Sequence, residues 1–164
     1  MPMNNLKDVY LDQLQDLYSA CDQSHLSTLK LMDAASDAEL TQALKDGAKG
    51  IESGMAELKA LCDGHEIDPK GEHCKGMEGL VREAKAHALE ATFGDDAARD
   101  AMIITQYQRM VHYAIAGYGC LVAFADRLGF DADASVLRHL LEDTYGGDRR
   151  TTGLAAGSIN KKAA

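Results

Sequence analysis

Apolar residues recur at three- and four-residue steps along most of the chain, the spacing that places them on one face of an α-helix. Four long segments show this pattern, at about 4–34, 36–64, 96–128 and from about 131 onward. Strand signals are weak, because β-branched residues are few while Ala, Leu, Glu, Lys and Met dominate. The sequence therefore predicts an all-α protein built on four long helices.

Short polar signals indicate where these helices begin and end. Ser36 and Glu39 form the S-x-x-E pattern of a capping box, which predicts that the second helix begins at Ser36. Asp63-Gly64 is expected to end that helix, and Gly94-Asp95-Asp96 to cap the third, which Gly129 ends.

About thirty residues separate the second and third long helices. Residues 65–76 are expected to be a loop, because Pro69, Gly71 and Gly76 interrupt them, and a short amphipathic helix is expected at about 77–91. A long crossover with a short extra helix is the connectivity of a ferritin-like four-helix bundle. We expect residues 1–164 to form one such domain, with a frayed tail at about 156–164.

Composition excludes several classes of partner. The 17 basic residues stand against 26 acidic ones, a net charge of −9, and no stretch gathers enough cations to follow a phosphate backbone. No run of about 18 apolar residues predicts a membrane span, and the start lacks the pattern of a secretion signal. The four cysteines lie far apart, which favours reduced thiols over a disulfide framework. We expect a cytoplasmic protein that binds neither nucleic acid nor membranes.

Several segments resemble one known family. The segments LQDLYSA at 14–20, CKGMEGL at 74–80 and HYAIAGYG at 112–119, with TGLA at 152–155 and NKKA at 160–163, are similar to the YciE/YciF family of bacterial ferritin-like proteins. The resemblance covers essentially the whole chain. It implies a ferritin-like fold, a cytoplasmic stress-associated protein, a homodimer and, in many members, a di-metal site.

The chain departs from that family where metal ligands are expected. Cys21 stands where the first helix usually has a glutamate, and Gly47 and Gly50 stand at the histidine and glutamate of a His-x-x-Glu-Thr segment. In the third helix, Val111 and Ala114 replace the two carboxylates of a Glu-His-Tyr-Glu segment. The resemblance therefore implies that most of the ligands have been lost.

In the fourth helix the series of acidic residues that is usual in the family is only partly kept. Glu142, Asp143 and Asp148 remain, but the place four residues before Asp148 is Thr144. A di-iron or di-manganese centre in such a bundle needs about four carboxylates and usually two imidazoles. The sequence therefore predicts no cofactor and a vacated di-metal site at Cys21, Gly47, Gly50, Val111, Ala114 and Thr144.

The favoured function is accordingly a non-catalytic, stress-associated structural or interaction protein, and two alternatives stay open. The first is a metal-dependent redox or hydrolytic protein that holds Fe or Mn at low occupancy on His112, Asp143 and Asp148, with Glu83 as a further candidate.

The second alternative is small-molecule binding in a bundle cavity. Each glycine inside a helix costs about 0.5–1 kcal/mol relative to alanine, so three glycines near one face of the second helix need an explanation. Either bulky side chains approach them closely or they border a ligand cavity. The candidate lining residues are Gly47, Gly50, Gly54, Tyr107 and Tyr118.

Overall fold

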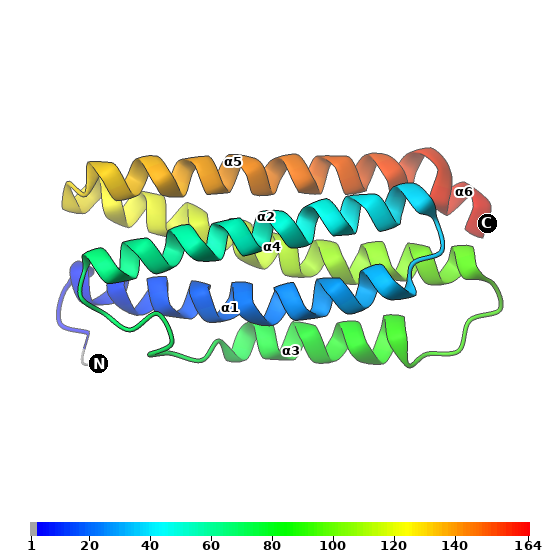
Figure 1. Cartoon of the computed structure of the whole chain (residues 1–164), viewed down its shortest axis with the longest axis horizontal. Coiled ribbons are helices and arrows are strands. Elements are labelled where there is room, and N and C mark those ends of the chain that lie inside the picture. The colour runs from blue at the N-terminus through cyan, green and yellow to red at the C-terminus, as the bar shows by residue number, and fades with distance from the viewer. Residues whose placement is uncertain (1–2) are drawn as a thin grey trace.

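The computed structural model describes residues 3–164, and helices account for most of them (Figure 1). The long helices are α1 (Leu6–Ala34), α2 (Ala38–Gly64), α4 (Asp96–Leu128) and α5 (Asp131–Leu154). The connection from α2 to α4 contains α3 (Lys75–Ala84) and the π-helical turn η1 (Lys85–Leu89). A second π-helical turn, η2 (Ala155–Ile159), leads from α5 to α6 (Asn160–Ala163). No strand occurs within residues 3–164, and the all-α prediction is confirmed.

The four long helices form a bundle in which each is antiparallel to its neighbours (Figure 1). Helix α1 packs against α2 and α4, and α5 packs against the same two helices from the other side. Helices α2 and α4 therefore run in the same direction, so the chain must return along the bundle between them. The crossover provides this return, and α3 packs against α1 and α4. This is the long-crossover topology of ferritin-like bundles, as predicted.

The N-cap of helix α2 is one residue later than the capping pattern predicts. The N-cap is Asp37, whose carboxylate accepts hydrogen bonds from the backbone N–H groups of Glu39 and Leu40 at 3.0 and 3.1 Å. The backbone N–H groups of Ser36 and Asp37 donate to the buried carboxylate of Asp100 on α4, at 2.8 and 2.9 Å. The predicted capping box at Ser36 is therefore wrong, because a carboxylate from a distant helix fixes this turn.

Residues 156–164, expected to be a frayed tail, are helical as far as Ala163. Ile159 is only 1% exposed and belongs to the hydrophobic core. The ammonium group of Lys162 lies 2.9 Å from the carboxylate of Asp37, at the start of α2. One buried apolar side chain and one ion pair thus hold this end on the bundle. Neither contact can be read from the local sequence.

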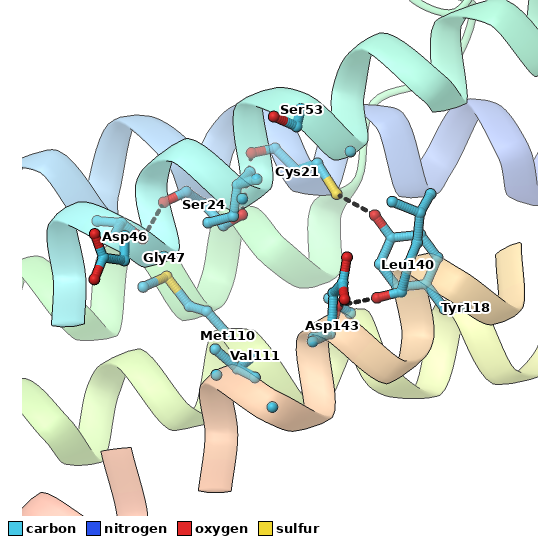
Figure 2. A pocket seen from close by; sticks show the side chains of 18 of the residues that line it. Cys21, Ser24, Asp46, Gly47, Ser53, Met110, Val111, Tyr118, Leu140 and Asp143 are labelled. Carbon is cyan, nitrogen blue, oxygen red and sulfur yellow. Dashed lines mark hydrogen bonds between the residues drawn. The ribbon is translucent and has the colours of Figure 1, made fainter. Parts of the chain in front are cut away.

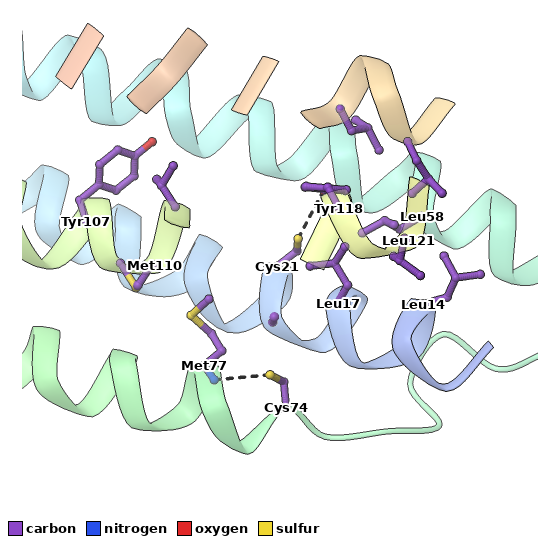
Figure 3. Close-up of a cluster of buried hydrophobic side chains, with 14 of the residues drawn as sticks. Leu14, Leu17, Cys21, Leu58, Cys74, Met77, Tyr107, Met110, Tyr118 and Leu121 are labelled. Atoms are coloured by element: carbon purple, nitrogen blue, oxygen red, sulfur yellow. Dashed lines mark hydrogen bonds between the residues drawn. The ribbon is translucent and has the colours of Figure 1, made fainter. Parts of the chain in front are cut away.

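The core lies along the axis of the bundle, where the apolar stripes of the long helices meet (Figure 3). Leu14 of α1, Leu58 of α2 and Leu121 of α4 are each fully buried there. Burying one such side chain contributes about 1.5–3 kcal/mol, so these stripes dominate the stability of the bundle. Within residues 3–164, no helix is long and apolar enough to cross a membrane.

Candidate functional site

A cavity of about 520 Å³ lies between the four long helices (Figure 2). All six positions predicted to be a vacated metal site line it, namely Cys21, Gly47, Gly50, Val111, Ala114 and Thr144. The structure therefore brings together, from four helices, every position at which the family resemblance implies a lost ligand.

The cavity opens between α2 and α5. The residues that α1 and α4 contribute to its wall are buried or half-buried, whereas Asp46 and Gly50 of α2 and His139 and Asp143 of α5 are exposed. Glycines contribute to this opening on both helices, because Gly50 of α2 and Gly146 and Gly147 of α5 line the cavity. No atom lies within 4 Å of a Cβ atom built on any of these three glycines, so the space beside them is open.

The three glycines of α2 have different surroundings. A Cβ atom on Gly47 would overlap the Tyr107 hydroxyl, and one on Gly54 would lie 3.2 Å from the Tyr118 hydroxyl oxygen. No atom of the structure lies within 4 Å of such a Cβ atom on Gly50. Close approach of a tyrosine therefore explains Gly47 and Gly54, whereas Gly50 faces open space.

Cys21 occupies the floor of the cavity as a protonated thiol. Its sulfur lies 3.6 Å from the Tyr118 hydroxyl oxygen, at hydrogen-bond distance (Figures 2 and 3). Burial raises the pKa of the Cys21 thiol to about 11. At neutral pH this group is therefore neither a nucleophile nor a ready metal ligand, since both roles require the thiolate.

The hydroxyl groups on the cavity wall are mostly directed at the backbone. Ser24 donates to the carbonyl oxygen of Cys21 at 3.0 Å, Thr28 donates to that of Ser24 at 2.7 Å, and Thr144 donates to that of Leu140 at 2.7 Å. These bonds satisfy the donors within their own helices, so none of the three protons is directed toward the centre of the cavity.

Tyr107 differs from these residues. Its side chain is only 5% exposed, yet its hydroxyl has no hydrogen-bond partner among residues 3–164. Burial raises the pKa of Tyr107 to about 12, and the charge of Asp148 adds to the effect. Figure 3 shows the ring reaching from α4 toward α2. A donor without a partner therefore lies at the wall of the cavity.

The residual metal candidates do not converge. His112 and Asp148 lie 3.1 Å apart, but neither lines the cavity, and the His112 side chain is 61% exposed. Asp143 lies at the opening and pairs with His139 one turn away, at 3.3 Å. Glu83 pairs with His87 at 3.2 Å on the exposed side of the crossover. The structure therefore does not bring these four candidate ligands together at one site.

The donor set does not fit a di-metal centre. Of the six positions, two are glycine, two are the apolar Val111 and Ala114, and the other two are the protonated Cys21 thiol and the bonded Thr144 hydroxyl. Within residues 3–164, no three His, Cys, Asp or Glu side chains are placed to hold a metal ion together. Hard divalent ions require oxygen donors that neutralise their charge, and none of the six positions supplies a carboxylate.

Sequence reasoning missed the charged residues at the opening. The Arg150 guanidinium lies 2.7 Å from the carboxylate of Asp46, linking α5 to α2 across the opening, and Glu57 also lines the cavity. The one local signal was Gly146-Gly147, since two glycines inside a helix mark a place where side chains are absent.

The chain is similar to proteins of known structure over almost its full length. Protein YciF of Escherichia coli (strain K12) is 33% identical over 164 residues, which cover 99% of this chain and 98% of that protein. The crystal structure of the E. coli stress protein YciF matches with a TM-score of 0.90 at 32% identity, covering 97% of this chain and 99% of that one.

A second solved structure agrees. YcfI of Rhodopseudomonas palustris, for which a structural role has been suggested, matches with a TM-score of 0.86 at 27% identity, over 92% of this chain and 94% of that one. Residues 5–164 match the family described as a domain of unknown function, DUF892. The chain therefore belongs to this family, that of the YciE/YciF ferritin-like proteins.

Proposed function

We propose that this chain is a non-catalytic member of its family, a stress-associated structural or interaction protein whose di-metal site has been vacated. The observation that carries the proposal is the composition of the cavity wall. All six ligand positions are occupied by glycine, alanine, valine, threonine or a protonated cysteine. None of the six supplies a carboxylate or an imidazole to a di-metal centre.

The energetics of burial explain why the ligands are absent as a set. A carboxylate buried without a metal or a cation costs several kcal/mol unless it becomes protonated. Once one ligand is lost, the remaining ones destabilise the bundle, and their replacement by uncharged residues is favoured. Cys21 and Val111, which are 4% and 7% exposed, stand at the positions where such a carboxylate would be most costly.

Relatives support the association with stress. E. coli YciF is described as a stress protein, and a structural role has been suggested for R. palustris YcfI. We propose a role of the same kind for this chain, in the cytoplasm and as a homodimer. Light scattering tests the dimer, which should have twice the 17.7 kDa mass of the chain. A monomer at micromolar concentration would contradict it.

Elemental analysis tests the vacated site. The protein, purified without chelators from bacteria grown with added iron and manganese, should contain well below one equivalent of either metal per chain. The matched control, prepared in parallel, is a variant that restores four glutamates through Cys21→Glu, Gly50→Glu, Val111→Glu and Ala114→Glu. Two equivalents per chain, removable only by strong chelation, would overturn the proposal.

A further inference from the structure

We propose that the central cavity binds an uncharged, largely apolar small molecule that carries a hydrogen-bond acceptor, and that this acceptor receives the proton of the Tyr107 hydroxyl. This inference goes beyond the structural role and does not depend on it. It rests on three independent features of the cavity, which are its space, its polar group and the charges at its opening.

The cavity has the size of a ligand site. Its volume of about 520 Å³ lies within the range of about 300–1,000 Å³ that is typical of small-molecule pockets. Met110, Val111 and Leu140 supply apolar walls, and Gly50 leaves the opening clear. A molecule with one or two fused rings can therefore enter between α2 and α5 and bury its apolar body.

One polar group is available inside. Tyr107 is only 5% exposed, and no hydrogen bond to its hydroxyl exists among residues 3–164, whereas Ser24, Thr28 and Thr144 donate to backbone carbonyls. Within residues 3–164 the only fully buried side-chain N or O atom without a partner is Gln106 Oε1, so the Tyr107 hydroxyl is accessible from the cavity that Tyr107 lines and can donate its proton to an acceptor on a ligand. The acceptor of the ligand therefore belongs beside Tyr107.

The charges at the opening exclude an anion. Asp46, Glu57 and Asp143 line the cavity, while the only Lys or Arg side chain on its wall within residues 3–164 is Arg150, which pairs with Asp46 at 2.7 Å. A carboxylate or phosphate on the ligand would face this acidic opening without an unpaired cation to neutralise it. An uncharged ligand avoids the repulsion.

The test uses Prodan, an uncharged naphthalene that carries a ketone and whose emission reports hydrogen bonding at that ketone. Titrating the full-length protein into Prodan should give saturable binding of one molecule per chain. Anilinonaphthalene sulfonate, which has a similar aromatic body and a negative charge, should bind at least about tenfold more weakly. Absence of saturable Prodan binding, or equal affinity for the two dyes, would overturn the proposal.

Two glycine variants locate the binding. Gly50→Leu places a side chain at the opening, where no atom lies within 4 Å of the new Cβ atom, and it should weaken Prodan binding at least about tenfold. Gly79→Leu is the matched control, because Gly79 of α3 is equally unobstructed but lies outside the cavity wall, and it should bind Prodan like the parent. Circular dichroism verifies the fold of each variant. Equal affinities in the two variants would overturn the proposed site.

Tyr107→Phe tests the polar contact. Removing the hydroxyl should weaken Prodan binding about fivefold, the effect of one hydrogen bond, and shift the emission of bound Prodan to shorter wavelength. A role of Tyr107 in packing alone would leave that emission unchanged. Unchanged emission together with unchanged affinity would overturn the assignment of the Tyr107 hydroxyl as the donor.

Discussion

The hydroxyl of Tyr107, on α4, occupies the space that a side chain on Gly47 of α2 would need. The ring carbon that bears this hydroxyl lies 3.2 Å from an ideal Cβ atom on Gly47, so the whole end of the ring blocks the position. Gly50, one turn further along α2, has no atom within 4 Å of its Cβ position. The two glycines thus share a helix and differ in what faces them.

This difference predicts opposite effects of the same substitution. Gly50→Ala should stabilise the protein by about 0.5–1 kcal/mol, because alanine favours the helix and meets nothing. Gly47→Ala should cost about 1–3 kcal/mol, because the methyl group overpacks against Tyr107. Urea unfolding of both variants measures the two free energies.

Adding Tyr107→Phe tests whether the tyrosine hydroxyl causes the loss of stability in Gly47→Ala. In the Tyr107→Phe background the hydroxyl is gone, so Gly47→Ala should cost at least about 1 kcal/mol less than in the parent, while Gly50→Ala should have the same effect in both. An equal cost of Gly47→Ala in the two backgrounds would show that the hydroxyl does not block Gly47.

Much of the fold follows from local signals in the sequence. Helix α4 spans Asp96–Leu128, the range predicted, because Asp95 caps its start and Gly129, with φ +71°, ends it. Contacts between distant segments could not be predicted in this way. The buried carboxylate of Asp100 holds the turn before α2, and Ile159 anchors the C-terminal residues, although nothing near either residue in the sequence indicates its partner.

The candidate site was predictable only in part. Helical periodicity and the family resemblance together place Cys21, Gly47 and Val111 on inward faces, and all three line the cavity. Periodicity states which face a residue occupies but not how far a side chain reaches. That Tyr107 fills the space at Gly47, and that nothing fills the space at Gly50, therefore follows only from the three-dimensional structure.

Restoring the carboxylates tests whether the cavity is a former metal site. The substitutions Cys21→Glu, Gly50→Glu, Val111→Glu and Ala114→Glu together should lower the melting temperature without metal, since Cys21 and Val111 are buried. Ferrous or manganous ion should restore stability by binding the native state only. Thermal melts with and without metal measure both effects. A variant as stable as the parent and indifferent to metal would contradict the assignment.

The single glutamate substitutions should differ in how much they lower the free energy of unfolding. Cys21→Glu should cost about 3 kcal/mol or more, because it buries a lone charge, whereas Gly50→Glu should cost little, because Gly50 is exposed at the opening. Urea unfolding of the two variants gives this order. Equal costs at the two positions would show that the glutamate introduced in place of Cys21 reaches solvent.

Substitutions at the start of α2 test whether Asp37, and not Ser36, caps this helix. Asp37→Ala should cost about 1 kcal/mol, the usual effect of removing an N-cap, together with the loss of its ion pair with Lys162. Ser36→Ala should change the free energy of unfolding by less than about 0.5 kcal/mol, because only the backbone of Ser36 is bonded there. A larger loss of stability in Ser36→Ala than in Asp37→Ala would instead support the capping box that the sequence pattern predicts.

The buried thiol of Cys21 makes stability depend on alkaline pH. Burial raises its pKa to about 11 in the folded protein, whereas an unfolded thiol has a pKa of about 8.5. Between these values the unfolded chain loses a proton that the folded protein keeps, so the stabilisation present at neutral pH is lost as pH rises. Burial also raises the pKa of Cys62 to about 11 and that of Tyr107 to about 12, which adds to the loss.

We therefore expect the free energy of unfolding to fall steadily above about pH 9, with Cys21 contributing about 1 kcal/mol per pH unit. Cys21→Ser removes this thiol, and the variant should lose stability less steeply between about pH 9 and 10.5, whatever the substitution costs at neutral pH. Cys120→Ser is the control, because Cys120 is exposed, and it should keep the slope of the parent. Urea unfolding at several pH values gives the three slopes. The same slope in Cys21→Ser and the parent would show that the thiolate of Cys21 is accommodated without unfolding.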